Sequence, residues 1–205
     1  WGDGIRSVEA GPLGALMIND GAVSGSPIRP ANPALAAAIE FSNLLVSRGI
    51  TVRDAPEVGT ASTDVPLIAS LESVVMREVV TELLTNSDNN TAELLVKEIG
   101  RVGRGSATRI DGLNVIASKI AEWGLPGEGV ALLDGSGLDR ANYLTCNLLS
   151  QLLERDGQNG LVTSALATAG KTGTLRDVFL SGPGSGTMRA KTGTLNGVKS
   201  LSGMF

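Results

Sequence analysis

The chain has 205 residues and a formal net charge of -4, with 42% apolar and 19% charged residues. This composition allows one generous domain or two small ones with a real core, and it argues against global disorder. The mild negative charge argues against a nucleic-acid-binding protein, which usually carries a basic stripe. No run of about 18 apolar residues occurs, so the sequence predicts no membrane span.

Histidine is absent, and Cys146 is the single cysteine. The lack of histidine excludes Ser-His-Asp triads, Cys-His dyads and histidine-containing metal sites. A single cysteine forms neither an intrachain disulfide nor a zinc cluster, and the surrounding run LTCNLLSQLL predicts a small buried residue on a helix. Hydrolytic chemistry must therefore use Ser, Lys, Asp, Glu or Asn, and no residue implies a cofactor or a metal.

The first 65 residues predict a small α/β unit. The apolar run at 13–20 and the segment 50–54 are expected to be strands, and a helix is expected from Pro33 to a cap at Gly49. The polar stretch at 55–66 is typical of a linker, so we expect a domain boundary between residues 65 and 66.

The remainder predicts helices in its middle and strands at its end. Helices are expected at 74–84, 91–100, 109–124 and 145–155, with a short strand at 67–72 and a strand leading into a turn at 129–140. Ser73 is expected to cap the first of these helices and Thr145 the last. Asn90 and Glu93 have the spacing of a capping box for the second helix.

The sequence KTGTL occurs twice, at 171–175 and at 191–195. The first copy resembles the end of a phosphate-binding loop, but that loop needs a glycine where Ala165 stands, and a preceding strand that is not evident. The second copy precedes Asn196-Gly197, which predicts a hairpin with a type I′ turn between strands at about 187–195 and 198–205. We therefore take the second copy, on a strand, as the candidate site.

The residue types of this second copy fit the binding of an anionic substrate. The ammonium of Lys191 attracts negative charge and stabilises it. The hydroxyl of Thr192 can bind a carboxylate, and Gly193 lets a ligand approach the backbone closely. Three such common residues also recur by chance, so the copy is a weak signal by itself.

A second motif, Ser87-Asp88-Asn89, lies roughly a hundred residues upstream, between two predicted helices. Residues of these types commonly cap helices, and one of them is expected to do so here. Ser-Asp-Asn followed by Lys-Thr-Gly is also the motif pair of serine β-lactamases and penicillin-binding proteins. Capping by one residue does not exclude a second role for Ser87 and Asn89.

The chain resembles the penicillin-binding proteins of the type 4 class, which are D-alanyl-D-alanine carboxypeptidases/endopeptidases. The segments LLTNSDNNTAELLVKEIG, LLDGSGLDRANYLT, AGKTGTLRDVF and MRAKTGTLNGVKSLSG carry the resemblance. It implies an α/β (α+β) fold in which 66–205 form an incomplete transpeptidase-like core, as in serine β-lactamases, with an antiparallel sheet and a helical part. Residues 1–65 would be the C-terminal part of one or more inserted small α/β domains.

The resemblance implies cleavage of peptidoglycan stem peptides through an acyl-enzyme, with inhibition by β-lactams. Ser87 would take part in proton transfer and Asn89 would hold the substrate amide. Lys191 would supply positive charge and Thr192 would bind the terminal carboxylate of a D-Ala-D-Ala peptide. The backbone N–H of Thr194 would form half of the oxyanion hole, and Gly193 would complete the substrate-binding strand.

Two further residues and the first KTGTL copy also take meaning from the resemblance. Leu138 and Arg140 look like residues that border the pocket for the stem-peptide side chain in some relatives, although Arg140 could equally be a surface ion-pair residue. In the first copy, Gly-Thr-Leu at 173–175 matches a family turn, whereas Lys171 and Thr172 occupy variable positions. We therefore interpret the first copy as a chance completion of a structural turn.

The nucleophile motif of the family, Ser-x-x-Lys, is missing, because no lysine of the chain follows a serine by three positions. Thr168-x-x-Lys171 is the nearest imitation. We therefore expect the nucleophile upstream of this chain, on an N-terminal fragment of the same enzyme. A catalytically inactive peptidoglycan-binding homologue stays open as an alternative, as does a class A-like β-lactamase.

The implied partners are peptidoglycan stem peptides and β-lactams, without nucleic acid or a membrane span. Because peptidoglycan lies outside the cytoplasm, the resemblance implies a secreted protein of the periplasm or cell wall.

Overall fold

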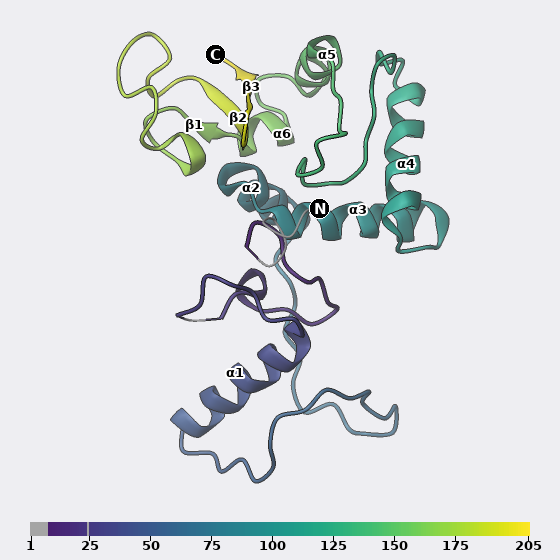
Figure 1. Ribbon diagram of the computed structural model, residues 1–205, viewed down its shortest axis with the longest axis vertical. Helices are drawn as coiled ribbons and strands as arrows, with labels where there is room; N and C mark the ends of the chain where they lie inside the picture. The colour runs from purple at the N-terminus through teal and green to yellow at the C-terminus, as the bar shows by residue number, and fades with distance from the viewer. Residues whose placement is uncertain (1–7, 24) are drawn as a thin grey trace. The chain divides into compact units, whose positions relative to one another are not determined.

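The computed structural model describes residues 8–23 and 25–205 and contains two compact units, Trp1–Ser73 and Val74–Phe205 (Figure 1). The boundary expected between residues 65 and 66 lies inside an irregular segment that precedes the second unit. Within the described ranges, no helix combines the length and the apolar character that crossing a membrane requires.

In the first unit, the helix α1 (Pro33–Ser47) forms where the sequence predicts it. Asn32 caps its start by accepting a hydrogen bond from Leu35 N at 3.1 Å, and Pro33 suits the first turn because its missing N–H has no helical partner there. Gly49 follows the end of the helix with a φ of 80°. A 3₁₀ turn, η1 (Asn19–Gly21), precedes α1.

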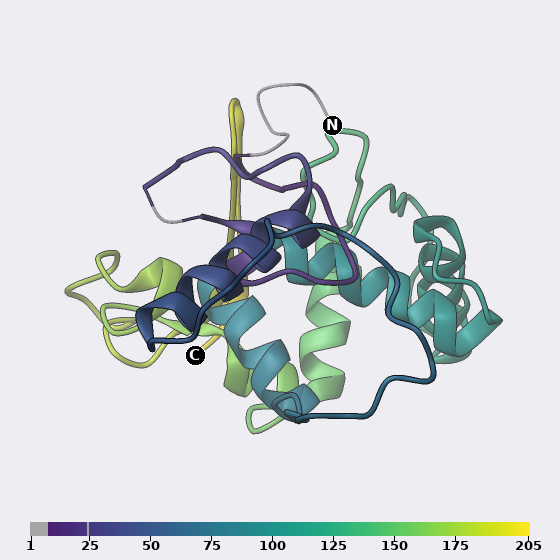
Figure 2. The same ribbon diagram turned by 90° about the horizontal axis from the view of Figure 1, so that it is seen from below.

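The strands predicted at 13–20, 50–54 and 67–72 are wrong. Apart from η1, these residues are irregular, and Figure 2 shows the chain after α1 as a long winding segment before the next helix. The described part of this unit contains no strand that could pair with them. An apolar run without a neighbouring strand leaves its backbone N–H and C=O groups to water, so the described residues of this unit contain the expected helix without the expected strands.

The second unit contains the expected helices together with a short additional one. They are α2 (Met76–Asn86), α3 (Asn89–Arg104), α4 (Arg109–Glu122), α5 (Cys146–Asp156) and α6 (Leu161–Ala165). Thr145 caps α5 through a 3.1 Å hydrogen bond from Leu148 N, as predicted. Cys146, the first residue of α5, is exposed, so the predicted burial of this cysteine is wrong.

Two predicted caps are also wrong. Ser73 is not a cap, because α2 begins after Val75, which makes no side-chain cap hydrogen bond. Asp88 caps α3 by accepting hydrogen bonds from Asn90 N and Thr91 N at 2.9 and 3.1 Å. The box expected from Asn90 and Glu93 is absent because both residues lie inside the helix and are buried.

Helices α3 and α4 cross at very close range (Figure 1). The contact depends on Gly112 of α4, where a Cβ atom would lie 1.9 Å from the carbonyl oxygen of Val96 on α3. Only a residue without a side chain allows such an approach of two backbones. The crossing therefore fixes the orientation of α3, the helix that begins with the Ser-Asp-Asn motif.

The sheet is antiparallel, with the order β1 (Ala167–Thr168), β2 (Arg189–Leu195) and β3 (Val198–Met204). The predicted hairpin is therefore confirmed as β2 and β3, with Leu195 opposite Val198. Its turn is not of type I′, because Gly197 has a φ of 77° whereas Asn196 is not among the residues with positive φ. A small core behind the sheet consists of Ala167, Ala169, Leu175, Met188 and Ala190.

Of the strand and turn expected at 129–140, the turn forms at the Asp-Gly-Ser-Gly segment, whereas the strand is reduced to a single bridge between Ala131 and Tyr143. Beyond this bridge the chain turns at once into the Asp-Gly-Ser-Gly loop, so no further ladder can form. The antiparallel sheet and the helical part expected from the sequence are thus both present in the second unit.

Candidate active site

The Ser-Asp-Asn motif forms the junction between α2 and α3. Ser87 ends α2 in the left-handed conformation, with φ 65° and ψ 51°, and its N–H donates to Leu83 O at 2.8 Å. Asp88 is the N-cap of α3, and Asn89 is its first residue. The capping role expected of the motif thus belongs to Asp88. Ser87 and Asn89 flank the cap on two rigid helix ends.

Lys191 of β2 joins this junction to the sheet. Its Nζ donates a hydrogen bond to Ser87 Oγ at 2.7 Å and another to Thr192 O at 2.6 Å. Burial lowers the pKa of Lys191 from its usual value, because a partly desolvated ammonium is less favourable than the neutral amine. The structure therefore brings the two predicted motifs together through their serine and lysine side chains.

The two KTGTL copies lie beside each other. A 3.0 Å hydrogen bond joins Thr192 Oγ1 of the second copy to Thr174 Oγ1 of the first. Thr174 belongs to η2 (Gly173–Leu175), and Gly173 packs so closely on α2 that a Cβ there would lie 1.9 Å from Thr85 O. The first copy is thus a wedge between the end of α2 and strand β2.

The lysine of the first copy lies outside this arrangement. Lys171 is exposed, and its Nζ donates to Gly186 O at 2.9 Å within the same turn region. This placement supports the second copy as the one that provides a lysine to the site. The sequence analysis did not identify Thr174 as a candidate site residue, although the repeated KTGTL sequence could have drawn attention to it.

The remaining residues of the second copy follow along β2. Gly193 lies opposite Ser200, and Thr194 is exposed opposite Lys199. β1 pairs with β2 only at Arg189 and Ala190. Among the described residues, the rest of that edge of β2 therefore has no strand neighbour, which leaves its backbone open to an extended ligand.

Leu138 and Arg140 lie on the loop of the Asp-Gly-Ser-Gly segment. The side chain of Leu138 is buried, whereas Arg140 is exposed and its guanidinium donates to the backbone carbonyl of Asn196 in the hairpin turn. Arg140 therefore lies at the far end of the strand that carries Lys191. A role of these two residues at a side-chain pocket stays a prediction.

A buried carboxylate holds this loop against α3. Glu93 is fully buried, and its Oε1 accepts hydrogen bonds from Gly135 N and Ser136 N, each at 2.9 Å, and from Ser136 Oγ at 2.8 Å. Arg109 of α4 donates to its other oxygen at 3.0 Å. These contacts satisfy the buried charge and tie the loop, α3 and α4 into one support for the site.

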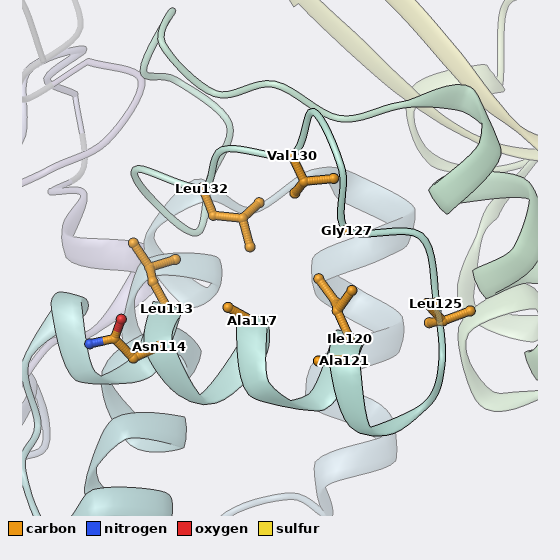
Figure 3. Close-up of a pocket in the computed structure, with 9 residues that line it drawn as sticks. All are labelled: Leu113, Asn114, Ala117, Ile120, Ala121, Leu125, Gly127, Val130 and Leu132. Atoms are coloured by element: carbon orange, nitrogen blue, oxygen red, sulfur yellow. The ribbon is translucent and has the colours of Figure 1, made fainter.

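A separate hollow lies between α4 and the chain that follows it (Figure 3). Its volume is about 290 Å³, and its walls are aliphatic apart from one amide: Leu113, Asn114, Ala117, Ile120, Ala121, Leu125, Gly127, Val130 and Leu132. It contains no ionisable side chain, so it offers no group for acyl transfer. In the described ranges, no group of three or more carboxylate or thiol residues is placed to hold a metal.

The chain is similar in sequence to known carboxypeptidases. It is 32% identical over 211 residues to the D-alanyl-D-alanine carboxypeptidase of an Actinomadura species, covering 98% of this chain and 37% of that protein. It is 30% identical over 177 residues to penicillin-sensitive carboxypeptidase A of Dictyostelium discoideum, covering 80% of this chain and 33% of that protein. The chain thus spans well under half the length of these relatives.

Solved structures give the same result for the fold. The crystal structure of penicillin binding protein 4 from Haemophilus influenzae in complex with a β-lactam matches with a TM-score of 0.64 and 25% identity, covering 84% of this chain and 41% of that one. A second structure of that protein matches with a TM-score of 0.57 and 26% identity over 62% of this chain and 29% of that one. These matches confirm the transpeptidase-like fold and the resemblance to type 4 penicillin-binding proteins.

The family of D-Ala-D-Ala carboxypeptidase 3 (S13) matches residues 15–205, which is nearly the whole chain. The match includes both motifs, the helices that support them and the hairpin. The chain belongs to the D-Ala-D-Ala carboxypeptidase 3 (S13) family.

Proposed function

We propose that the chain forms the Ser-Asp-Asn and Lys-Thr-Gly side of the active site of a serine-type D-Ala-D-Ala carboxypeptidase/endopeptidase. The hydrogen bond from Lys191 Nζ to Ser87 Oγ at 2.7 Å carries this proposal. It connects a polar hydroxyl at a helix junction to a partly buried cation on a strand with an open edge. Such a pair can bind an anionic substrate and pass a proton at the same place.

The substrate lies along the open edge of β2 as an extended peptide that ends in D-Ala-D-Ala. Its terminal carboxylate is attracted by the ammonium of Lys191 and accepts a hydrogen bond from the hydroxyl of Thr192. Gly193 allows the peptide backbone to come close, and Asn89 holds the amide that precedes the scissile bond. Leu138 and Arg140 border the pocket for the stem-peptide side chain.

The nucleophile is a serine supplied by sequence outside these 205 residues, on an N-terminal part of the same enzyme. Its oxygen attacks the carbonyl carbon of the penultimate D-Ala, and the N–H of Thr194 stabilises the resulting oxyanion together with the N–H of the nucleophile itself. As the C–N bond breaks, Ser87, held by Lys191, relays the proton lost by the attacking serine to the nitrogen of the departing D-Ala. Water then hydrolyses the acyl ester and regenerates the serine.

A β-lactam acylates the same serine, because its ring amide and carboxylate correspond to the scissile amide and the terminal carboxylate of the peptide. Acylation by a β-lactam leaves an ester that marks the nucleophile. The substrate implies action on peptidoglycan, in the periplasm or cell wall. The relatives named as D-alanyl-D-alanine carboxypeptidase and penicillin-sensitive carboxypeptidase support this assignment.

The test is to incubate the full-length protein with a fluorescent penicillin and to record its intact mass and the labelled peptide. We expect one label, on a serine of a Ser-x-x-Lys sequence outside this chain. A Ser87→Ala or Lys191→Met variant should label much more slowly. Absence of label from the wild-type protein would favour a catalytically inactive peptidoglycan-binding homologue. Label within these 205 residues would overturn the proposed source of the nucleophile.

A further inference from the structure

We propose that Thr174, in the first KTGTL copy, is a positioning residue that orients the hydroxyl of Thr192 toward the terminal carboxylate of the substrate. This inference rests on the proposed function, in which Thr192 binds that carboxylate. The observation behind it is the 3.0 Å hydrogen bond between the two hydroxyl oxygens, which lie 18 residues apart in sequence and are both part-buried.

Thr174 stands on a rigid support. Its neighbour Leu175 is 1% exposed and belongs to the core behind the sheet. Its other neighbour, Gly173, lies against the carbonyl oxygen of Thr85 on α2. Thr85 in turn donates its own hydroxyl to Ala165 O at 2.7 Å. With both neighbours fixed by packing, the Thr174 hydroxyl has a defined place beside β2.

The same wedge connects the two halves of the site. Thr85 lies in the last turn of α2, which ends at Ser87, and Thr192 follows Lys191 on β2. The η2 turn therefore touches α2 through Gly173 and β2 through Thr174. This arrangement gives the first copy a function that depends on its Gly-Thr-Leu part and not on its lysine.

The chemistry of a hydroxyl pair explains what the contact does. A hydroxyl group has one hydrogen to donate and two lone pairs to accept with. Either hydroxyl can donate to the other across the 3.0 Å contact of Thr192 with Thr174. A bound carboxylate can only accept, so Thr192 must turn its hydrogen toward the carboxylate when the substrate arrives. Thr174 then donates its own hydrogen to the oxygen of Thr192.

The bound carboxylate thus selects one direction of this hydrogen bond, and no proton moves from one oxygen to another. The result is a chain in which Thr174 donates to Thr192 and Thr192 donates to the carboxylate. Successive hydrogen bonds of this kind polarise one another, so each is stronger than it would be alone. Thr174 also holds the side chain of Thr192 in one rotamer before the substrate binds.

The test compares two substrates in the full-length protein. One is a peptide that ends in D-Ala-D-Ala with a free carboxylate, and the other is the same peptide as its C-terminal methyl ester. Thr174→Val removes the hydroxyl at nearly constant volume, and Thr174→Ser keeps it. Thr187→Val serves as the matched control, because the Thr187 hydroxyl is exposed and donates to Pro183 O at 3.1 Å.

For Thr174→Val we expect kcat/KM for the free acid to fall about 10-fold, mainly through a higher KM, as for the loss of a hydrogen bond that supports a charged group. The rate for the methyl ester should change by less than about two-fold, because no carboxylate is bound. Thr174→Ser and Thr187→Val should retain the acid-to-ester preference of the wild type.

An unchanged acid-to-ester preference in Thr174→Val would overturn the inference. This outcome arises either when neither rate changes or when both rates fall equally, and the second case would show a merely structural role. Either result leaves the proposed function standing if the wild-type protein hydrolyses the free acid. A wild-type protein that neither hydrolyses the peptide nor reacts with penicillin would overturn the proposed function and this inference together.

Discussion

The ammonium of Lys191 reaches the hydroxyl of Ser87 across 104 residues of sequence, with a nitrogen-to-oxygen distance of 2.7 Å. Lys191 is held by a strand, whereas Ser87 is held by the junction of two helices. The contact can therefore form only when the helical part and the sheet of this unit are packed against each other correctly. Its chemistry also determines how the site should respond to pH.

Burial lowers the pKa of Lys191, so its positive charge should disappear at a pH below the usual value of a lysine. Penicillin labelling of the full-length protein should therefore slow on the alkaline side, because the charge that we propose attracts the β-lactam carboxylate is lost. We expect the pH profile of the second-order labelling rate to show this alkaline limb in the wild type and in Lys199→Met. A Lys191→Met variant that keeps the limb would assign it to another group.

The same pKa shift affects stability. Because the folded state disfavours the charged form of Lys191, the unfolded state binds its proton more tightly. The free energy of unfolding should thus increase as pH rises from the lowered pKa toward the usual lysine pKa of 10.5. Denaturant titrations should show this increase as a rise with pH of the free energy of unfolding of the wild type minus that of Lys191→Met. A signed difference that falls with pH in this window would contradict the prediction.

Replacing Glu93 by alanine should destabilise the protein strongly. The change leaves the N–H groups of Gly135 and Ser136 and the guanidinium of Arg109 without their acceptor. Arg109 is partly exposed, so the main cost comes from the two backbone N–H groups left without an acceptor, at about 1–3 kcal/mol each. Urea unfolding should show this loss, with Glu98→Ala as the control, because Glu98 pairs with Arg101 on the exposed surface of the same helix. Equal effects of the two substitutions would contradict the proposed anchoring role of Glu93.

Gly112→Ala should also lower the thermal unfolding temperature. The new Cβ would lie 1.9 Å from Val96 O, so α3 and α4 would have to separate. Overpacking of this kind costs about 1–3 kcal/mol or more. Gly59→Ala is the matched control, since nothing lies within 4 Å of its Cβ position. If both variants melt like the wild type, the close crossing of the helices does not exist in solution.

The lowered pKa of Asp156 predicts that the free energy of unfolding decreases at acidic pH. Burial raises its pKa, but hydrogen bonds from the N–H and hydroxyl of Thr163 at 2.7 and 2.8 Å outweigh that effect, and the pKa is lowered from 3.8. The carboxylate therefore stabilises the fold above pH 3.8 and loses this contribution as pH falls through the lowered pKa.

We expect Asp156→Asn to be less stable than the wild type near neutral pH, with a difference that shrinks toward about pH 2 as the wild-type carboxyl is protonated. Glu154→Gln, on the exposed side of α5, should follow the wild type throughout. Denaturant titrations followed by circular dichroism at a series of pH values would measure both. A constant difference between Asp156→Asn and the wild type would show that the charge of the carboxylate has no role.

The sequence predicted those parts of the structure that depend on local chemistry. The start of α1 at Pro33, the helix cap at Thr145, the glycine after α1 and the β2–β3 hairpin all follow from residues close to one another in the chain. The strand predicted at 50–54 failed because a strand depends on a partner, and the described first unit contains none. Local pattern alone does not reveal such an absence.

The same limit applies to the site. The two motifs were recognisable from the types and order of their residues, whereas the contact of Thr174 with Thr192 arises only when η2 is placed against α2 and β2. Glu93 is a comparable case. Its spacing from Asn90 was typical of a capping box, but the loop at 134–140 folds over it and buries it, and sequence spacing contains no information on that approach.

The left-handed conformation of Ser87 has an energetic consequence. Holding a residue other than glycine in this region costs about 1–3 kcal/mol, and the fold retains that strain where the serine hydroxyl meets Lys191. Glycine at this position would relax the backbone and remove the hydroxyl together. Ser87→Gly should therefore raise the free energy of unfolding and slow penicillin labelling of the full-length protein, so stability and the proposed activity should oppose each other at this single residue.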